Sequence, residues 1–286
     1  MHLGSFSPEL FLNTPLPSSS IHYVFAVQHI RRMRGGSQSH LLRCSDGKLY
    51  VVKFLNNPQH ARVLANEILA TGLAELAGLP VPNVALVRVD HSLIEDTPAL
   101  TVSLLDRTIP CEAGTQFGSE YVINPFEGRI FDDIPAEQLN RVRNLGDFAG
   151  VLAFDKWTGN VDDRQATFWR KNRQKKYTAT FIDHGHCFNV GEWTFPDNPF
   201  RGCYRRNEVY LGVHGWQSFE PWLSRIETMD DLSVGTLGRR IPSEWSIGAN
   251  ELSSLLKALS DRRSMVRDLI QHFRFSRRAP FPNWHD

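Results

Sequence analysis

The stretch GNVDDRQATF (residues 159–168) decides the fold together with a second stretch, FIDHGH (residues 181–186). The first is a polar loop that follows an apolar segment and carries Asp162. The second is a short apolar strand that ends in a carboxylate, Asp183, with a glycine two residues later. Phosphoryl transfer uses two such carboxylates, one to orient the attacking oxygen and one to hold magnesium. The two stretches therefore predict a cleft that both side chains face.

A lysine stands upstream of both stretches, in the β-branched run Tyr50–Phe54. Because side chains alternate across a strand, Lys53 shares a face with Val51 and Leu55. On a buried face its ammonium needs a compensating anion. Glu67, which has apolar neighbours in the helix that follows, is the candidate. The pair is typical of a site that neutralises nucleotide phosphates; an edge-strand lysine and a solvated glutamate are the alternative.

A glycine-rich run, GGSQS at residues 35–39, lies ahead of the lysine strand. Glycines let backbone amides approach phosphate oxygens, and serine hydroxyls add donors. Gly35, Gly36, Ser37 and Ser39 are therefore predicted to bind the nucleotide. A plain turn is the alternative interpretation of this run.

The two carboxylates have different predicted roles. Asp162 would accept or orient the proton of an acceptor hydroxyl, although an aspartate that caps a loop is the common alternative. Asp183 stands at a strand end with Gly185 freeing the next turn, which suits magnesium binding. His184 and His186 do not complete a zinc set, and no HExxH motif is present, so metal-hydrolase chemistry is disfavoured.

Composition sets outer limits on function. The 286 residues allow one large domain or two small ones, and 41% hydrophobic and 22% charged residues are ordinary for a soluble globular protein. A net charge of +1 gives no strong signal for nucleic acid or for an anionic membrane. The four cysteines form no CxxC pair, which argues against zinc and favours reduced thiols and a cytoplasmic location.

The order of elements predicts a bilobal α+β fold. Residues 1–20 read as a flexible leader with neither a secretory signal nor a membrane span. Residues 21–108 read as a small β-rich lobe that grips the nucleotide phosphates. Residues 109–286 read as a larger helical lobe that carries the catalytic and metal loops, and this arrangement is that of a protein kinase-like fold.

Individual elements follow from periodicity and turn signals. Strands are predicted at 23–27, 40–44, 49–55, 84–89 and 100–104, with a helix over 64–77 that Pro80 and Pro82 prevent from continuing. Further on, helices are predicted after Pro135, over 145–157 and over 250–273, with a hairpin whose arms are 167–170 and 177–182. Residues 190–240 are expected to be irregular, with aromatics that belong to the core.

At these residues the chain resembles the HipA-like kinases, distant relatives of protein kinases and phosphatidylinositol kinases. The run from Gly159 to Asp162, with Phe168, resembles the HipA catalytic loop. FIDHGH is similar to the metal-binding motif of phosphatidylinositol kinases, and Lys53, Glu67 and the turn after the helix also fit. The resemblance covers about residues 22–190. It implies ATP and Mg²⁺ as cofactors.

One position departs from the family pattern. The HipA loop carries a magnesium-binding Asn five residues after the catalytic Asp, where this chain has Thr167. A hydroxyl can hold magnesium but is a poorer ligand than an amide carbonyl, and Thr167 is predicted as the second metal ligand beside Asp183. Asp155 and Asn160 also stand five apart, but Asp155 should lie within the apolar helix, which disfavours that register.

The sequence thus predicts an ATP- and Mg²⁺-dependent phosphotransferase whose acceptor is a hydroxyl on a protein or a small molecule. The adenine is expected near residues 104–111. Thr167 keeps a second interpretation open, a weak or inactive pseudokinase that binds a nucleotide or a partner. A third is a small-molecule kinase that resembles the aminoglycoside phosphotransferases.

Overall fold

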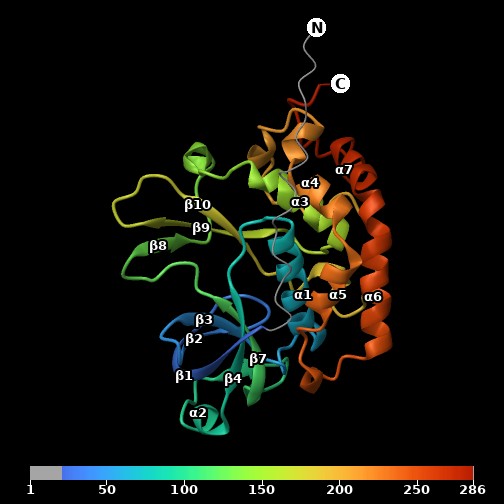
Figure 1. The fold of residues 1–286 in the computed structure, drawn as a ribbon. Coiled ribbons are helices and arrows are strands. Elements are labelled where there is room, and N and C mark those ends of the chain that lie inside the picture. The colour runs from blue at the N-terminus through green and yellow to red at the C-terminus, as the bar shows by residue number, and fades with distance from the viewer. Residues whose placement is uncertain (1–20, 286) are drawn as a thin grey trace.

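The computed structural model describes residues 21–285, so the predicted leader lies outside the described residues. The fold is α+β and bilobal, as the sequence predicted: a barrel of strands lies at the bottom of Figure 1 and a larger, mainly helical body lies above it. Among the described residues, no helix is both long and apolar enough to cross a membrane.

Five strands close into a barrel in the order β1-β2-β3-β7-β4. β1 and β4 run parallel, whereas the other neighbours in the barrel are antiparallel. Alternate side chains such as Leu42 and Val52 point into an apolar interior. The strands are β1 (His22–Arg32), β2 (His40–Cys44), β3 (Leu49–Lys53), β4 (Val84–Val89) and β7 (Gly114–Glu120).

The strand expected at 100–104 does not complete this sheet, and that expectation is wrong. β5 (Thr101–Ser103) pairs instead with β6 (Thr108–Pro110) in a separate hairpin. The turn is closed by the amide of Leu104, which donates to the carbonyl of Arg107 at 2.7 Å. β7 closes the barrel in its place, so the sheet continues past residue 108, and residues 121–127 join it to the next strand.

Helix α1 (Arg62–Leu76) lies between the barrel and the helical body (Figure 1). Residues 63–74 are all buried, because one side packs on barrel residues such as Leu86 and the other enters the larger core through Leu69 and Leu73. The helix ends as predicted before Gly78, whose φ of +80° favours glycine. A short helix, α2 (His91–Glu95), follows β4.

The centre of the second lobe is α3 (Asp147–Thr158), buried throughout from residue 148. It confirms the predicted central helix and ends at Gly159, which has a φ of +59°. The predicted hairpin is also present and joins a third strand in a sheet that projects from the body in Figure 1. Its strands are β8 (Gly128–Phe131), β9 (Gln165–Lys171) and β10 (Thr178–Ile182).

The C-terminal third differs from the expectation in two places. The single helix predicted over 250–273 is divided into α6 (Ala249–Arg262) and α7 (Val266–Arg274), and the 3-10 turn between them lets α7 pack on α3. The stretch 190–240 is not irregular throughout, because it contains α4 (Trp222–Thr228) and α5 (Asp231–Gly238). Its aromatics mostly enter or pack against the core, although Phe200 is exposed.

Short 3-10 segments connect the remaining parts. They are Ala136–Arg141, Cys187–Asn189, Asn207–Tyr210, Trp216–Phe219, Ser243–Trp245 and Arg263–Met265.

Candidate active site

Three charged side chains from distant parts of the chain meet where the two lobes face each other. The ammonium of Lys53, at the end of β3, lies 2.5 Å from Glu67 Oε1 on α1 and 2.7 Å from Asp183 Oδ1 after β10. The first two side chains are buried, whereas that of Asp183 is 29% exposed. Burial alone would lower the pKa of Lys53, but the two carboxylates raise it above its ordinary value.

Glu67 also fixes the loop that carries Asp183. Its carboxylate accepts the backbone amides of His184 at 3.1 Å and Gly185 at 2.9 Å. A Cβ on Gly185 would lie 2.7 Å from a methyl of Val63, so only glycine fits between the loop and α1. Glu67 therefore fixes both the ammonium of Lys53 and the backbone that follows Asp183.

Asn66, the neighbour of Glu67, holds the continuation of the same loop. Its buried amide donates to the carbonyls of Gly185, Cys187 and Val190 at 2.9, 3.1 and 2.6 Å. The loop needs this support because Asp183, Phe188, Asn189, Val190 and Trp193 all have φ between 53° and 61°. Such backbone conformations cost free energy and persist where the surroundings impose them.

A buried ion pair joins the predicted catalytic loop to the end of α3. Arg164 donates to Asp155 through Nε at 2.9 Å and through Nη2 at 2.5 Å, and neither side chain is exposed. Asn160 adds a third bond to Asp155 Oδ1 at 3.0 Å and accepts the amide of Asp162 at 3.1 Å. Arg164 also donates to the carbonyl of Ile182 at 2.9 Å. The pair thus ties the end of α3 to the loop that begins at residue 183.

Asp162 is the open carboxylate of this loop. Its side chain is 48% exposed, with Oδ2 3.5 Å from Nδ1 of His186. Its other oxygen accepts the amide of Asp163 at 2.8 Å. Asp183 contacts Lys53, and His186 contacts Asp162. The short loop 183–186 therefore places the predicted groups Lys53, Asp162 and Asp183 close together.

Thr167 lies away from these carboxylates. It is buried in β9, and its hydroxyl donates to the carbonyl of Phe131 at 3.4 Å. Strand pairing sets Gln165 opposite Ile182 and Thr167 opposite Thr180, farther along the hairpin from Asp183. No hydrogen bond joins Thr167 to Asp183 in the described part of the chain.

The glycine-rich run forms the turn between β1 and β2. Gly35 has a φ of +127°, while Ser37 and Ser39 are buried. Gln38, within the run, fastens this turn to β5: its amide donates to the carbonyl of Ser103 at 2.7 Å and accepts that residue's N–H at 2.6 Å. The turn is therefore tied to a neighbouring hairpin through a side chain that the sequence did not single out.

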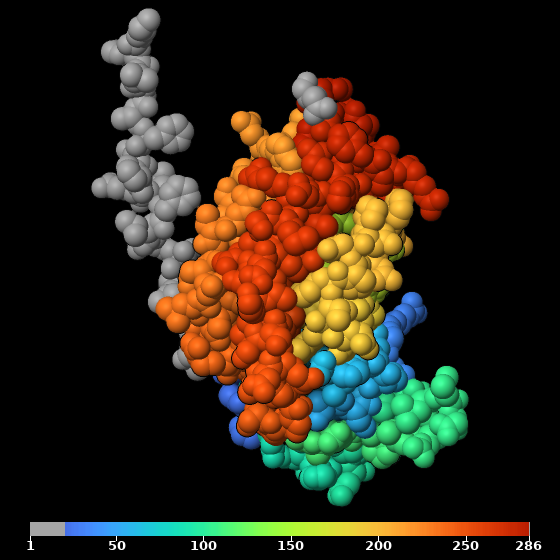
Figure 2. Space-filling model, turned by 90° about the vertical axis from the view of Figure 1, so that its right-hand side faces the viewer, coloured from blue at the N-terminus to red at the C-terminus, as the bar shows by residue number. Residues whose placement is uncertain are grey.

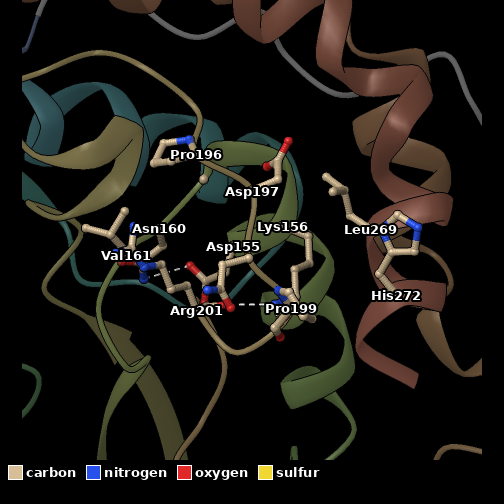
Figure 3. A pocket seen from close by; sticks show the side chains of 12 residues that line it. Asp155, Lys156, Asn160, Val161, Pro196, Asp197, Pro199, Arg201, Leu269 and His272 are labelled. Atoms are coloured by element: carbon tan, nitrogen blue, oxygen red, sulfur yellow. Dashed lines mark hydrogen bonds between the residues drawn. The ribbon is translucent and has the colours of Figure 1, made fainter. Parts of the chain in front are cut away.

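A hollow lies between the end of α3, residues 159–161, residues 196–201 and α7 (Figure 3). Lys156 lines this hollow and donates to the carbonyls of Pro199 at 3.0 Å and Arg201 at 2.5 Å. Burial lowers the pKa of Lys156 to about 8. Arg262 adds a bidentate pair with Asp197 at 2.6 and 3.0 Å.

These contacts hold the segment after the Asp183 loop on the helical lobe. Figure 2 shows that segment in yellow at the surface, between the red C-terminal helices and the light blue start of α1. The same surface carries a bond from Arg62 on α1 to the carbonyl of Gly191 at 2.6 Å.

The donor set fits a magnesium ion that arrives with a nucleotide better than a resident metal. Within residues 21–285, no group of three or more His, Cys, Asp or Glu side chains is placed to hold a metal ion. Magnesium is commonly bound through one or two carboxylates and the substrate phosphates. Asp183 offers one partly exposed carboxylate of that kind, with Lys53 beside it for the phosphate charge.

Several residues of this site were not singled out in the sequence. Asn66 could have been found in the same way as Glu67, because it is a polar residue within the apolar run LANEIL. Arg164 carries no such signal, since it stands in a polar loop whose contacts arise only in three dimensions.

The comparison with family models identifies the family of the chain. The model of the HipA-like kinase family matches residues 26–197, and the chain therefore belongs to that family. No curated protein matches the chain.

Solved structures agree on a kinase-like fold. The proinflammatory kinase CtkA of Helicobacter pylori superimposes with a TM-score of 0.56 at 12% identity, covering 89% of this chain and 97% of CtkA. HipA of Shewanella oneidensis, in a complex with HipB and operator DNA, gives 0.50 at 13% identity over 87% and 68% of the two chains. A Golgi casein kinase with Mn and ADP bound gives 0.50 at 11% identity over 90% and 75%. The predicted bilobal protein kinase-like architecture is thus confirmed.

Proposed function

We propose that this protein is an ATP- and Mg²⁺-dependent phosphotransferase with a hydroxyl acceptor. The convergence of Lys53, Glu67 and Asp183 carries the proposal, because a buried ammonium held by one carboxylate and facing a second, partly exposed one suits a phosphate and its metal. Membership of the HipA-like kinase family supports it.

The proposed roles divide between the lobes: the barrel lobe, which β7 extends from the predicted boundary at residue 108 to residue 120, grips the nucleotide phosphates, and the second lobe supplies the loops. Lys53, fixed by Glu67, neutralises phosphate charge. Asp183 holds the magnesium, which when bound would offset the negative charge of the phosphates. Asp162 orients the acceptor hydroxyl and accepts its proton. Positioning and charge neutralisation supply most of the rate, since the protein has little covalent work to do.

The glycine-rich turn and the interlobe connector complete the nucleotide site. We place the phosphates under Gly35, Gly36, Ser37 and Ser39, where open space beside Gly35 leaves the backbone accessible. The adenine is placed beside residues 121–127, because this segment, rather than 104–111, leads from the barrel into the second lobe.

One observation favours the second candidate, a nucleotide-binding pseudokinase. The Thr167 hydroxyl is engaged with the carbonyl of Phe131 rather than with either carboxylate. A site that lacks its second protein ligand for magnesium would bind the nucleotide and transfer slowly or not at all. A one-metal site that uses Asp183 alone remains consistent with transfer.

Two assays on the same preparation separate these candidates. Thermal unfolding is followed with ATP and Mg²⁺ at millimolar concentration, and radiolabel from [γ-³²P]ATP is followed into the protein and into added hydroxyl acceptors. Stabilisation together with transfer supports the phosphotransferase, and stabilisation without transfer supports the pseudokinase. Absence of any shift in melting temperature would contradict both.

A further inference from the structure

His186 links Asp162 to the first lobe through its two ring nitrogens. Nδ1 lies 3.5 Å from Asp162 Oδ2, and Nε2 lies 2.9 Å from the side-chain nitrogen of Gln59. The ring is 23% exposed, whereas the Asp162 carboxylate is 48% exposed. His186 therefore lies between Gln59 of the first lobe and the more exposed carboxylate of Asp162.

The partners determine which ring nitrogen carries the proton. Nε2 faces the side-chain nitrogen of Gln59, which donates, and Nδ1 faces the carboxylate of Asp162, which accepts. A neutral imidazole then carries its proton on Nδ1, which faces the Asp162 carboxylate. The arrangement Gln59–His186–Asp162 therefore directs one N–H at the carboxylate.

Gln59 is itself held in place on the loop between β3 and α1. The buried side chain of Asn57 accepts the backbone N–H of Gln59 at 3.0 Å and donates to the carbonyl of Phe54 at 2.9 Å. Above Gln59 lies the glycine-rich turn, where a Cβ on Gly36 would stand 3.0 Å from the Gln59 side-chain nitrogen. Gly36 therefore permits the turn to rest directly on Gln59.

A backbone hydrogen bond fixes His186 relative to the loop that carries Asp162. The amide of Val161 donates to the carbonyl of His186 at 3.2 Å, so the catalytic loop and the Asp183 loop lie side by side. The Asp162 carboxylate has one oxygen beside Nδ1 of His186 and the other on the amide of Asp163. Both oxygens have a donor nearby, and the exposed edge stays open to an acceptor.

We propose that His186, with its tautomer set by Gln59, is a positioning residue that orients Asp162 toward the acceptor hydroxyl. The proposal rests on the phosphotransferase function proposed above. A chain of contacts connects the glycine-rich turn to Gln59, Gln59 to His186, and His186 to Asp162. The lobe that binds the phosphates therefore also positions the carboxylate that faces the acceptor hydroxyl. Loss of orientation in the His186 variants lowers kcat and leaves nucleotide binding intact, because no hydrogen bond or ion pair joins His186 to Lys53 or Glu67 within residues 21–285.

Three substitutions of His186 separate positioning from simple packing. In His186→Asn the side-chain amide stands near the place of Nδ1 and can still donate to Asp162, whereas His186→Gln reaches the place of Nε2 and His186→Leu donates nowhere. We expect kcat to fall about 10- to 100-fold in the Gln and Leu variants, the scale of a misplaced catalytic group. We expect the Asn variant to stay within about threefold of wild type and the KM for ATP to change little.

Gln59→Leu extends the kinetic test to the first lobe, and His214→Asn is the matched control because His214 is exposed and lies outside the site. Gln59→Leu should lower kcat as His186→Leu does, and the control should not. Wild-type kcat in His186→Leu, or a parallel rise of the KM for ATP, overturns the proposal. A wild-type protein that transfers no phosphate overturns the proposed function as well, so the two failures are distinguishable.

The tautomer is measured without any turnover. In protein with ¹⁵N-labelled histidine, the ring nitrogen shifts of His186, assigned by its loss in His186→Asn, should show the proton on Nδ1. Gln59→Leu should move the proton toward Nε2 or create a mixture. A proton on Nε2 in the wild type overturns the proposal even if the enzyme is active.

Discussion

Asp155 and Asp162 stand seven residues apart on either side of the same turn, yet their environments are opposite. Asp155 is unexposed, and both of its oxygens are engaged by Arg164, with Asn160 adding a further bond. Asp162 is 48% exposed and keeps an edge open to solvent. Each carboxylate is followed five residues later by a polar residue of a type that can bind a metal, so spacing alone did not separate them.

The difference lies in what each oxygen already binds. A carboxylate whose lone pairs are taken by a buried guanidinium cannot also receive a proton from a substrate. Asp155 therefore organises the loop, and Asn160 braces it, whereas Asp162 is left to meet an acceptor. The predictions below test this division between a structural and a reacting carboxylate.

The largest expected effect on stability is at Asp155. Asp155→Ala leaves the guanidinium of Arg164 buried without its partner, and breaking a buried pair in this way costs about 3–5 kcal/mol. Asp162→Ala should change the free energy of unfolding by less than about 0.5 kcal/mol, as exposed positions usually do. Urea denaturation of both variants measures the contrast, and equal stabilities would contradict it.

The reverse contrast is expected in activity. Asp162→Ala should lower kcat about 10²- to 10⁴-fold, the usual contribution of a general base, without weakening ATP binding. Steady-state rates and ATP-dependent melting shifts on the same variant give both quantities. Retention of wild-type kcat would remove Asp162 from the reaction.

Lys53→Ala should abolish the stabilisation that ATP gives. At a nucleotide concentration about one hundred times the Kd, that stabilisation amounts to about 2.7 kcal/mol. Lys48→Ala is the matched control, because Lys48 lies in the preceding turn, half exposed and paired with Glu120. Isothermal calorimetry checks the result, and ATP binding by Lys53→Ala at wild-type affinity would refute the role of the lysine.

The smallest effect is expected at Thr167. Thr167→Asn should leave the affinity for Mg²⁺ in the presence of ATP unchanged, because residue 167 is buried in β9 and bonds to the carbonyl of Phe131, away from Asp183. Titration of Mg²⁺ against the variant measures this. Tighter Mg²⁺ binding by the variant would contradict this placement and support the family register that starts at Asp162.

The parts of the site that the sequence predicted are those where a charge interrupts an apolar run. Lys53 and Glu67 stand out because their neighbours are buried, and burial of one demands the other. Gln59 and His186 act through partners far away in the chain, and Arg164 through one nine residues before it, but a polar loop gives no sign of which polar residue will find a partner.

The fold shows the same limit. The strands and the central helix follow from local periodicity, but the choice of β7 rather than residues 100–104 to close the barrel depends on a hairpin turn near Arg107. The break between α6 and α7 likewise follows from packing on α3, which the amphipathic pattern over 250–273 does not reveal.

The most direct test of the account is the transfer of labelled phosphate from [γ-³²P]ATP, measured with Mg²⁺ for the wild type and Asp162→Ala at equal ATP occupancy. The account predicts transfer by the wild type and at least about a hundredfold less by the variant. Equal transfer by both, or bound ATP with no transfer by either, would contradict it.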